Sequence, residues 1–253
     1  MQTNEQNRIA YGATTTRSQV EIDQGLRAFM LGVYNNMVLG LAITGLVALG
    51  AFMMATTTAP GGGLALTAFG EAIYMSPLRW VLMLSPLAFI FFFAFKIESL
   101  KPQTALMMFL GFAALMGISM SAIFLVFTGQ SITQVFFITA AAFGGLSLYG
   151  YTTKRSLSGM GSFLVMGLIG LILAMIVNLF LGSGALGFVV SVIGVFIFAG
   201  LTAWDTQRLK EMYLYGNLNA DSAGRASVMG ALSLYLNFVN MFQFLLALLG
   251  NRE

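Results

Sequence analysis

The sequence predicts an all-α integral membrane protein, because the 253-residue chain is strongly apolar, carries few charges and contains seven long hydrophobic runs. Hydrophobic residues make up 58% of the chain and charged residues only 8%. In an ordinary soluble domain, roughly a quarter of the residues are charged. So few polar side chains cannot cover a water-facing surface, and the many Phe and Met residues exclude a disordered chain.

The chain divides into a polar tail and one helical bundle. Residues 1–27 are polar and lack the apolar core and cleavage site of a secretory signal, so we expect a cytosolic tail. A spanning helix needs about 20 mostly apolar residues. Residues 28–253 supply seven such segments, with spans near 28–54, 78–96, 104–127, 131–151, 161–181, 185–204 and 229–249.

The links between the runs differ in length. Those at 128–130 and 182–184 are so short that the helices on either side must form tight antiparallel hairpins. The longest link between runs, 55–77, contains Pro60 followed by three glycines, a composition that predicts a flexible connection.

The distribution of Lys and Arg predicts the orientation in the membrane. Ten of these residues lie in the tail and in the links on the same side, against Arg79 and Arg252 on the other side. Cytoplasmic loops carry the excess of Lys and Arg, so we expect a cytosolic N-terminus and, after seven spans, an external C-terminus. The same pattern accounts for the net charge of +3, so no nucleic-acid partner is expected.

Two missing residue types exclude whole classes of site. The chain has no Cys and no His, which removes thiolate and imidazole metal ligands, thiol nucleophiles and the usual histidine base. Zinc-dependent and Ser-His intramembrane proteases are therefore excluded. We expect no cofactor.

A polar stripe marks the last apolar run. Ser233, Asn237 and Asn240 recur at i, i+4 and i+7, with Gln243 three residues further, so they share one helix face. Such a stripe should face the other helices. It either supplies hydrogen bonds between helices or lines a polar path.

Asp205 is the one acidic residue that can lie inside the membrane, at the cytosolic end of the sixth run. Counted from the same side, Asn237 lies about eight residues into the last helix, or roughly 12 Å. The two share a layer if the sixth helix continues past Arg208. The alternative is an interfacial Asp205 that pairs with Arg208 at i+3 and contributes little.

Three segments together resemble the transmembrane Bax inhibitor motif (Bax inhibitor-1-like) family, in its bacterial branch. They are YGYTTKRSLSGMG at 149–161, GLTAWDTQ at 200–207 and ALSLYLNFVN at 231–240. The resemblance covers all seven apolar runs. It implies six helices around a central seventh, in the bacterial plasma (inner) membrane, and a pH-sensitive calcium leak down the ion's gradient.

In relatives with that activity, one aspartate on the sixth helix and one on the seventh share protons and gate the pore. Asp205 matches the first, whereas Asn237 stands where the second would be. The resemblance also implies a basic partner, for which Arg208, Lys96 and Lys101 are candidates. With one carboxylate the shared proton is lost, so we expect a weaker or acid-shifted pH dependence.

Calcium fits the residues only as an ion in transit. It takes six to eight oxygen ligands, and Asp205, Asn237, Ser233 and Asn240 offer a few transient contacts. We therefore expect a gate and ion path at these residues, with no stably bound metal.

Two other functions stay open. The first is a non-conducting membrane protein that modulates a membrane-bound protease, as the resemblance implies for some bacterial relatives. The tail at 1–27 is long enough to engage such a partner. The second, an enzyme, is disfavoured: intramembrane aspartyl proteolysis needs two aspartates and the spans offer only Asp205. We expect that the protein is not an enzyme.

Overall fold

The structure is a computed structural model that describes residues 19–59, 61–216 and 218–252, without the side chains of residues 19, 20, 94 and 98. In this part of the chain the long helices are α2 (Gln19–Ala55), α4 (Leu78–Lys96), α5 (Pro102–Met120), α6 (Gly129–Thr152), α7 (Ser158–Leu181), α8 (Gly184–Tyr215) and α9 (Ala220–Leu249). The predicted all-α architecture is confirmed. Each predicted apolar run overlaps one of these helices, although the run at 104–127 extends past the end of α5.

Within the described residues, six helices are long and apolar enough to cross a bilayer. A seventh candidate is a bent pair, in which 68–75 and 78–93 meet at 62°. The first half of this pair consists of α3 (Ala68–Gly70) and the π-helical segment η1 (Glu71–Met75). Ser76 and Pro77 separate it from α4, and the extended backbone of Ser76 interrupts the helix there.

Three helices extend far beyond the predicted spans. The helix α2 already begins at Gln19, so residues 19–27 of the predicted tail are helical, while residues 1–18 lie outside the described chain. The helix α8 continues to Tyr215, and α9 begins at Ala220. Hydropathy marks only the apolar part of a helix. Good helix formers such as those in QRLKEM at 207–212 continue the same helix beyond the apolar run.

The tight hairpin predicted at 182–184 is confirmed, because α7 and α8 pack along each other. The one predicted at 128–130 is wrong: the segment η3 (Ser121–Leu125) and three further residues separate α5 from α6, and these two helices lie on opposite sides of α9 with hardly any contact. Gly182 ends α7 in the left-handed conformation (φ 60°), and the Ser183 side chain accepts a hydrogen bond from the Leu186 amide to begin α8. Thr128 caps α6 in the same way. Two helices continue into short 3-10 segments: η2 (Ile97–Ser99) follows α4, and η3 follows α5.

The link after α2 is more ordered than predicted. It contains an antiparallel pair of short strands, β1 (Thr56–Thr58) and β2 (Leu64–Leu66), with Thr56 opposite Leu66. The β-branched threonines favour the extended backbone. Gly62 and Gly63 form the turn at φ 77° and 116°, which residues with a Cβ rarely adopt.

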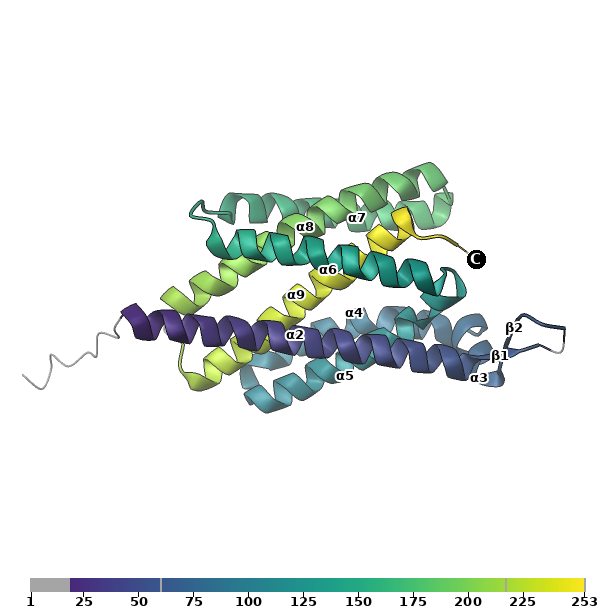
Figure 1. Ribbon diagram of the computed structural model, residues 1–253, viewed down its shortest axis with the longest axis horizontal. Coiled ribbons are helices and arrows are strands. Elements are labelled where there is room, and N and C mark those ends of the chain that lie inside the picture. Colours follow the sequence, from purple (N-terminus) through teal and green to yellow (C-terminus); the bar gives the residue numbers. More distant parts are fainter. Residues whose placement is uncertain (1–18, 60, 217, 253) are drawn as a thin grey trace, which may run out of the picture.

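The helix α9 runs obliquely between α2 and α5 on one side and α6 and α8 on the other (Figure 1). Its Tyr235 is fully buried, with the ring edge-on to Phe109 and Phe112 of α5. The Tyr235 hydroxyl lies 2.7 Å from Oγ1 of Thr44, which donates to the Ala113 carbonyl at 2.9 Å. This network connects α2, α5 and α9.

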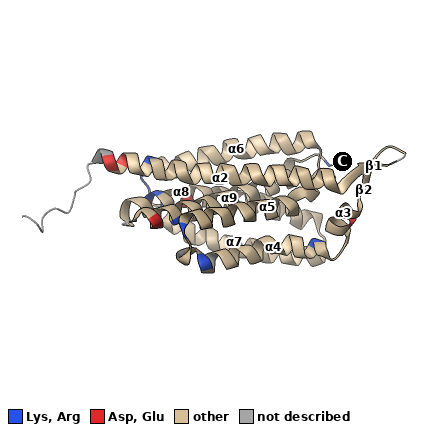
Figure 2. Cartoon of the chain, turned by 90° about the horizontal axis from the view of Figure 1, so that it is seen from below, with Lys and Arg blue, Asp and Glu red and all other residues tan. Residues whose placement is uncertain are grey.

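Charged side chains gather at the ends of the bundle. Figure 2 shows Lys and Arg mainly at the end where α2 begins, with fewer at the opposite end. The sides of the long helices are exposed and apolar, as the 84% exposure of Phe180 on α7 illustrates. Apolar sides between charged ends are the distribution expected for a protein surrounded by lipid.

Candidate functional site

The candidate site is centred on the Asp205 carboxylate, which α8 holds inside the bundle. Because α8 continues to Tyr215, Asp205 lies well within a regular helix. The residue is only 6% exposed, and Ala203 and Thr206 beside it are buried as well. A carboxylate in such surroundings loses most of its hydration, so its charge requires partners from the protein.

Two side chains supply those partners. Nδ2 of Asn237 on α9 donates a hydrogen bond to Oδ2 of Asp205 at 2.8 Å. Nη2 of Arg208, one helical turn further along α8, lies 3.2 Å from Oδ1. Each carboxylate oxygen therefore has its own donor, and the hydrogen bond joins α8 to α9.

Arg208 connects this buried group to the surface of the bundle. Its side chain is 45% exposed, against 8% for Asp205. Its guanidinium carbon lies 4.9 Å from the ring centroid of Trp204, and the indole packs against Gly161 of α7 so closely that a Cβ there would collide with it. A partly exposed ion pair of this kind contributes about 1 kcal/mol or less. Arg208 is therefore positioned by two neighbours but held weakly by each.

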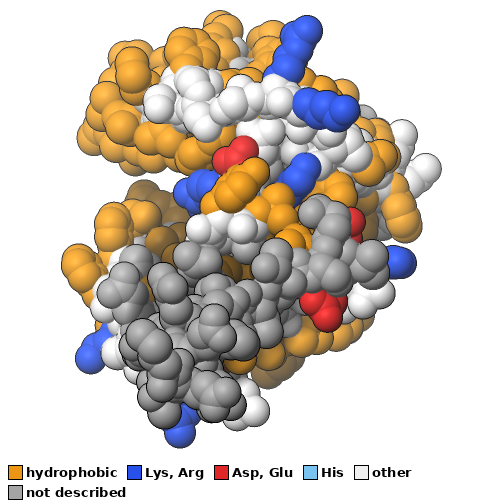
Figure 3. Space-filling model, turned by 90° about the vertical axis from the view of Figure 1, so that its left-hand side faces the viewer, with side chains coloured by type: hydrophobic (Ala, Val, Ile, Leu, Met, Phe, Trp, Pro, Cys, Tyr) orange, Lys and Arg blue, Asp and Glu red, His pale blue; other side chains and the backbone are white. Residues whose placement is uncertain are grey.

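A cavity of about 960 Å³ lies beside the pair, lined by α4, α5, α7, α8 and α9. Figure 3 shows the molecule hollowed on one side, between two groups of hydrophobic side chains. The polar stripe predicted on the last helix lies along the cavity, at Ser233, Asn237, Asn240 and Gln243.

Charge is scarce along the cavity. Asp205 and Arg208 are the two charged side chains in its described lining. Apolar side chains such as Phe127, which follows η3, make up most of the remaining lining. Asn240 uses an amide hydrogen to bond the Leu236 carbonyl of its own helix at 2.8 Å. The cavity thus has an ionisable pair and a line of neutral polar groups along otherwise apolar walls.

The family described as Inhibitor of apoptosis-promoting Bax1 matches residues 26–253. The chain belongs to this family. An uncharacterised protein of Caulobacter vibrioides is 46% identical over 240 residues, which are 94% of each chain. The inner membrane protein YbhL of Escherichia coli K12 is 40% identical over 238 residues, covering 93% of this chain and 97% of YbhL. This Bax inhibitor family protein is accordingly a multi-pass protein of the inner membrane.

The structure distinguishes the three basic residues that were candidates to pair with Asp205. Arg208 contacts Asp205, whereas Lys96 at the end of α4 and Lys101 before α5 are exposed. In the described chain neither lysine lines the cavity or forms an ion pair with Asp205. The structure therefore pairs neither Lys96 nor Lys101 with Asp205. The i, i+3 spacing on α8 already places Arg208 on the same helix face as the carboxylate.

The donor set is poor for a resident metal ion. Among the described residues no three Asp or Glu side chains come together, and both oxygens of Asp205 already have partners. A calcium ion needs several oxygens at once, and here it would have one carboxylate and a few neutral groups. A calcium ion would therefore meet too few oxygen ligands here to stay bound.

Gln207 has a structural role that its position in the sequence does not predict. It is buried on α8, accepts a hydrogen bond from the Leu157 amide at 2.7 Å and donates one to the Arg155 carbonyl at 2.8 Å. Lys210 adds a 2.8 Å bond to the Tyr151 carbonyl. These bonds hold the link between α6 and α7 against the helix that carries Asp205. The only signal in the sequence is the Asp-Thr-Gln motif itself.

Proposed function

We propose that this protein is a passive cation leak of the inner membrane, with calcium as cargo and Asp205 as the proton-sensitive gate. The observation that carries the proposal is a buried carboxylate beside a cavity, with one oxygen bonded to Asn237 on α9 and the other paired with Arg208. Ionisable groups within membrane helices are rare and are usually functional.

In the gate, ionised Asp205 acts as a latch. The carboxylate attracts Arg208 by charge and accepts a hydrogen bond from Asn237, so α8 and α9 are held together. Protonation removes the charge and with it the ion pair. Arg208 and Asp205 are the charged groups that face the cavity in the described chain, so no other ionised neighbour opposes this step. The flux should rise as the pH falls.

Beyond the gate, the stripe on α9 provides the path. Ser233, Asn237 and Asn240 can each offer a side-chain oxygen to a passing ion, with Gln243 further along. These contacts are few and neutral, so an ion that enters can also leave, as conduction requires.

The proposal includes the arrangement in the membrane. The six long apolar helices and the bent pair would make seven spans, with α9 as the central one. The Lys and Arg at the end where α2 begins support a cytosolic N-terminus and an external C-terminus. We also propose that the protein is not an enzyme, because the described cavity lining has a single carboxylate.

Calcium flux into dye-loaded liposomes tests the proposal. The wild type should conduct more at acid pH, and Asp205→Asn should conduct at the acid level throughout, because its side chain cannot ionise. Asp221→Asn, an exposed acid in the first turn of α9, is the matched control. Absence of flux from folded protein at every pH would refute a leak.

The same measurement separates the alternative function. A non-conducting modulator of a membrane protease would bind its partner through the tail, most of which lies outside the described residues. Such a protein would show no flux. It would lose its partner in co-purification from native membranes when residues 1–18 are deleted.

A further inference from the structure

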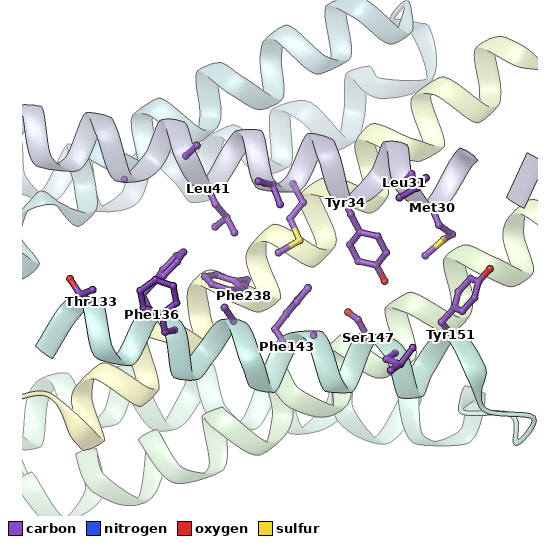
Figure 4. Close-up of a pocket in the computed structure, with 18 of the residues that line it drawn as sticks. Met30, Leu31, Tyr34, Leu41, Thr133, Phe136, Phe143, Ser147, Tyr151 and Phe238 are labelled. Atoms are coloured by element: carbon purple, nitrogen blue, oxygen red, sulfur yellow. The ribbon is translucent and has the colours of Figure 1, made fainter. Parts of the chain in front are cut away.

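A second and larger cavity, of about 1350 Å³, opens along a different face of α9. It lies between α2 and α6, which each pack against α9 but hardly against each other. Figure 4 shows Met30, Tyr34 and Leu41 of α2 facing Phe136 and Phe143 of α6, with Phe238 of α9 between them. The result is an apolar groove walled by two helices and floored by a third.

The length of the groove matches the membrane. Along α2 it extends from Arg27 to Leu49, about 33 Å at the rise of an α-helix, close to the roughly 30 Å of a hydrocarbon core. Its walls offer mostly aliphatic and aromatic surface, suited to an acyl chain. This feature alone would admit the tail of any lipid.

The end of the groove near the start of α2 adds chemical information. Asp23 and Arg27 both line it, both are exposed, and within the described chain no ion pair joins them. Arg27 follows Asp23 by four positions, so it lies about 6 Å deeper along the helix. The order from the apolar groove outward is therefore acyl surface, cation, anion.

One phospholipid headgroup has the complementary order. In phosphatidylethanolamine the glycerol is followed by an anionic phosphate and then by a primary ammonium with three N–H donors. Phosphatidylglycerol has no cation for Asp23, and the quaternary ammonium of phosphatidylcholine has no hydrogen to donate. Lys210, above the Tyr151 ring at the α6 side of the groove, already donates to the Tyr151 carbonyl.

We propose that the groove between α2 and α6 is a binding site for phosphatidylethanolamine. Its phosphate binds Arg27, its ammonium binds Asp23, and an acyl chain lies along Tyr34, Phe143 and Phe238. The charge-assisted hydrogen bonds at both ends of the headgroup distinguish this site from general lipid contact. The proposal does not depend on cation flux.

Lipid retention tests the site. Delipidated protein is reconstituted into vesicles of equal phosphatidylethanolamine, phosphatidylglycerol and phosphatidylcholine with identical acyl chains, and the lipids that remain bound in mild detergent are counted by native mass spectrometry. The wild type should retain phosphatidylethanolamine preferentially. Arg27→Gln should lower retention of all three lipids about tenfold, because a charge-assisted bond to phosphate is lost. Asp23→Asn should abolish only the preference for the primary amine.

Matched controls lie outside the groove. Arg155→Gln and Asp221→Asn change exposed charges that do not line it. Gly144→Phe tests the groove directly, because it places a ring inside the groove at a position where a Cβ meets nothing within 4 Å. Gly170→Phe is its control: a Cβ there also meets nothing within 4 Å, but the added ring lies on the exposed surface of α7, outside the groove. Only the first glycine variant should lose lipid, with both remaining helical by circular dichroism. Equal retention of the three lipids, a preference for phosphatidylglycerol, or retention unaffected by Arg27→Gln and Gly144→Phe would overturn the proposal.

Discussion

Asp205 on α8 and Asn237 on α9 meet through a 2.8 Å hydrogen bond, although 32 positions separate them in the chain. The amide of Asn237 donates and the carboxyl oxygen of Asp205 accepts, so this bond needs no proton shared between the two side chains. A second carboxylate at position 237 would instead have to share a proton with the first.

Asn237→Asp should increase the pH sensitivity of calcium flux in liposomes. Two carboxylates at hydrogen-bond distance cannot both ionise readily, so they titrate as a coupled pair and the gate responds more strongly to protons. Flux measured across a pH series on wild type and variant checks this. An unchanged pH–flux curve would count against the latch at Asp205.

Arg208→Gln should raise calcium flux at neutral pH by about two- to fivefold, the equivalent of losing an ion pair worth up to about 1 kcal/mol. The substitution frees Oδ1 of Asp205 while leaving the bond from Asn237 in place. Arg155→Gln removes an exposed positive charge away from the cavity and should leave the flux unchanged. If both variants behave alike, surface charge and not the ion pair controls entry.

Gln207→Ala should expose the link between α6 and α7 to protease. It removes both hydrogen bonds that hold Leu157 and Arg155 against α8, so local opening becomes easier. Limited trypsin digestion should cut faster after Lys154 and Arg155 than in the wild type. Gln130→Ala, an exposed glutamine at the start of α6, is the control, and equal cutting in both variants would refute the role of Gln207.

Tyr235→Phe should lower the melting midpoint in detergent by about 1–4 °C. The variant keeps the ring packing on Phe109 and Phe112 but loses the hydroxyl bond to Thr44, a contact worth about 1 kcal/mol within a membrane bundle. Tyr149→Phe removes an exposed hydroxyl and should have no effect. A midpoint equal to that of wild type would show that the Thr44–Tyr235 bond does not stabilise the bundle.

The positions of the long helices followed from hydropathy, because each needs a long apolar segment to face lipid. Their ends did not, since residues such as those from Arg208 to Tyr215 are polar enough to leave the membrane and still helical. The bend before α4 also escaped prediction. It depends on how Ser76 and Pro77 interrupt a helix whose composition on both sides is apolar.

The pairing of Asp205 with Asn237 was within reach of the sequence, because counting residues from the same membrane side placed them at similar depth. Arg208 was one of three basic candidates, and its i, i+3 position on α8 places it beside Asp205, whereas the two lysines are exposed and do not line the cavity. The groove between α2 and α6 was out of reach. A hydrophobic pattern predicts that a helix packs against others, but it does not predict which two helices stay apart and leave a groove between them.

The stacking of Arg208 on Trp204 gives this protein a built-in optical reporter. The chain has two tryptophans, so Trp80→Phe leaves a single indole, and that indole lies 4.9 Å from the guanidinium carbon. Any movement of Arg208 away from Asp205 changes the charge above the ring. Emission from Trp204 during acidification would therefore follow the gate directly, in the unlabelled protein and without any ion gradient.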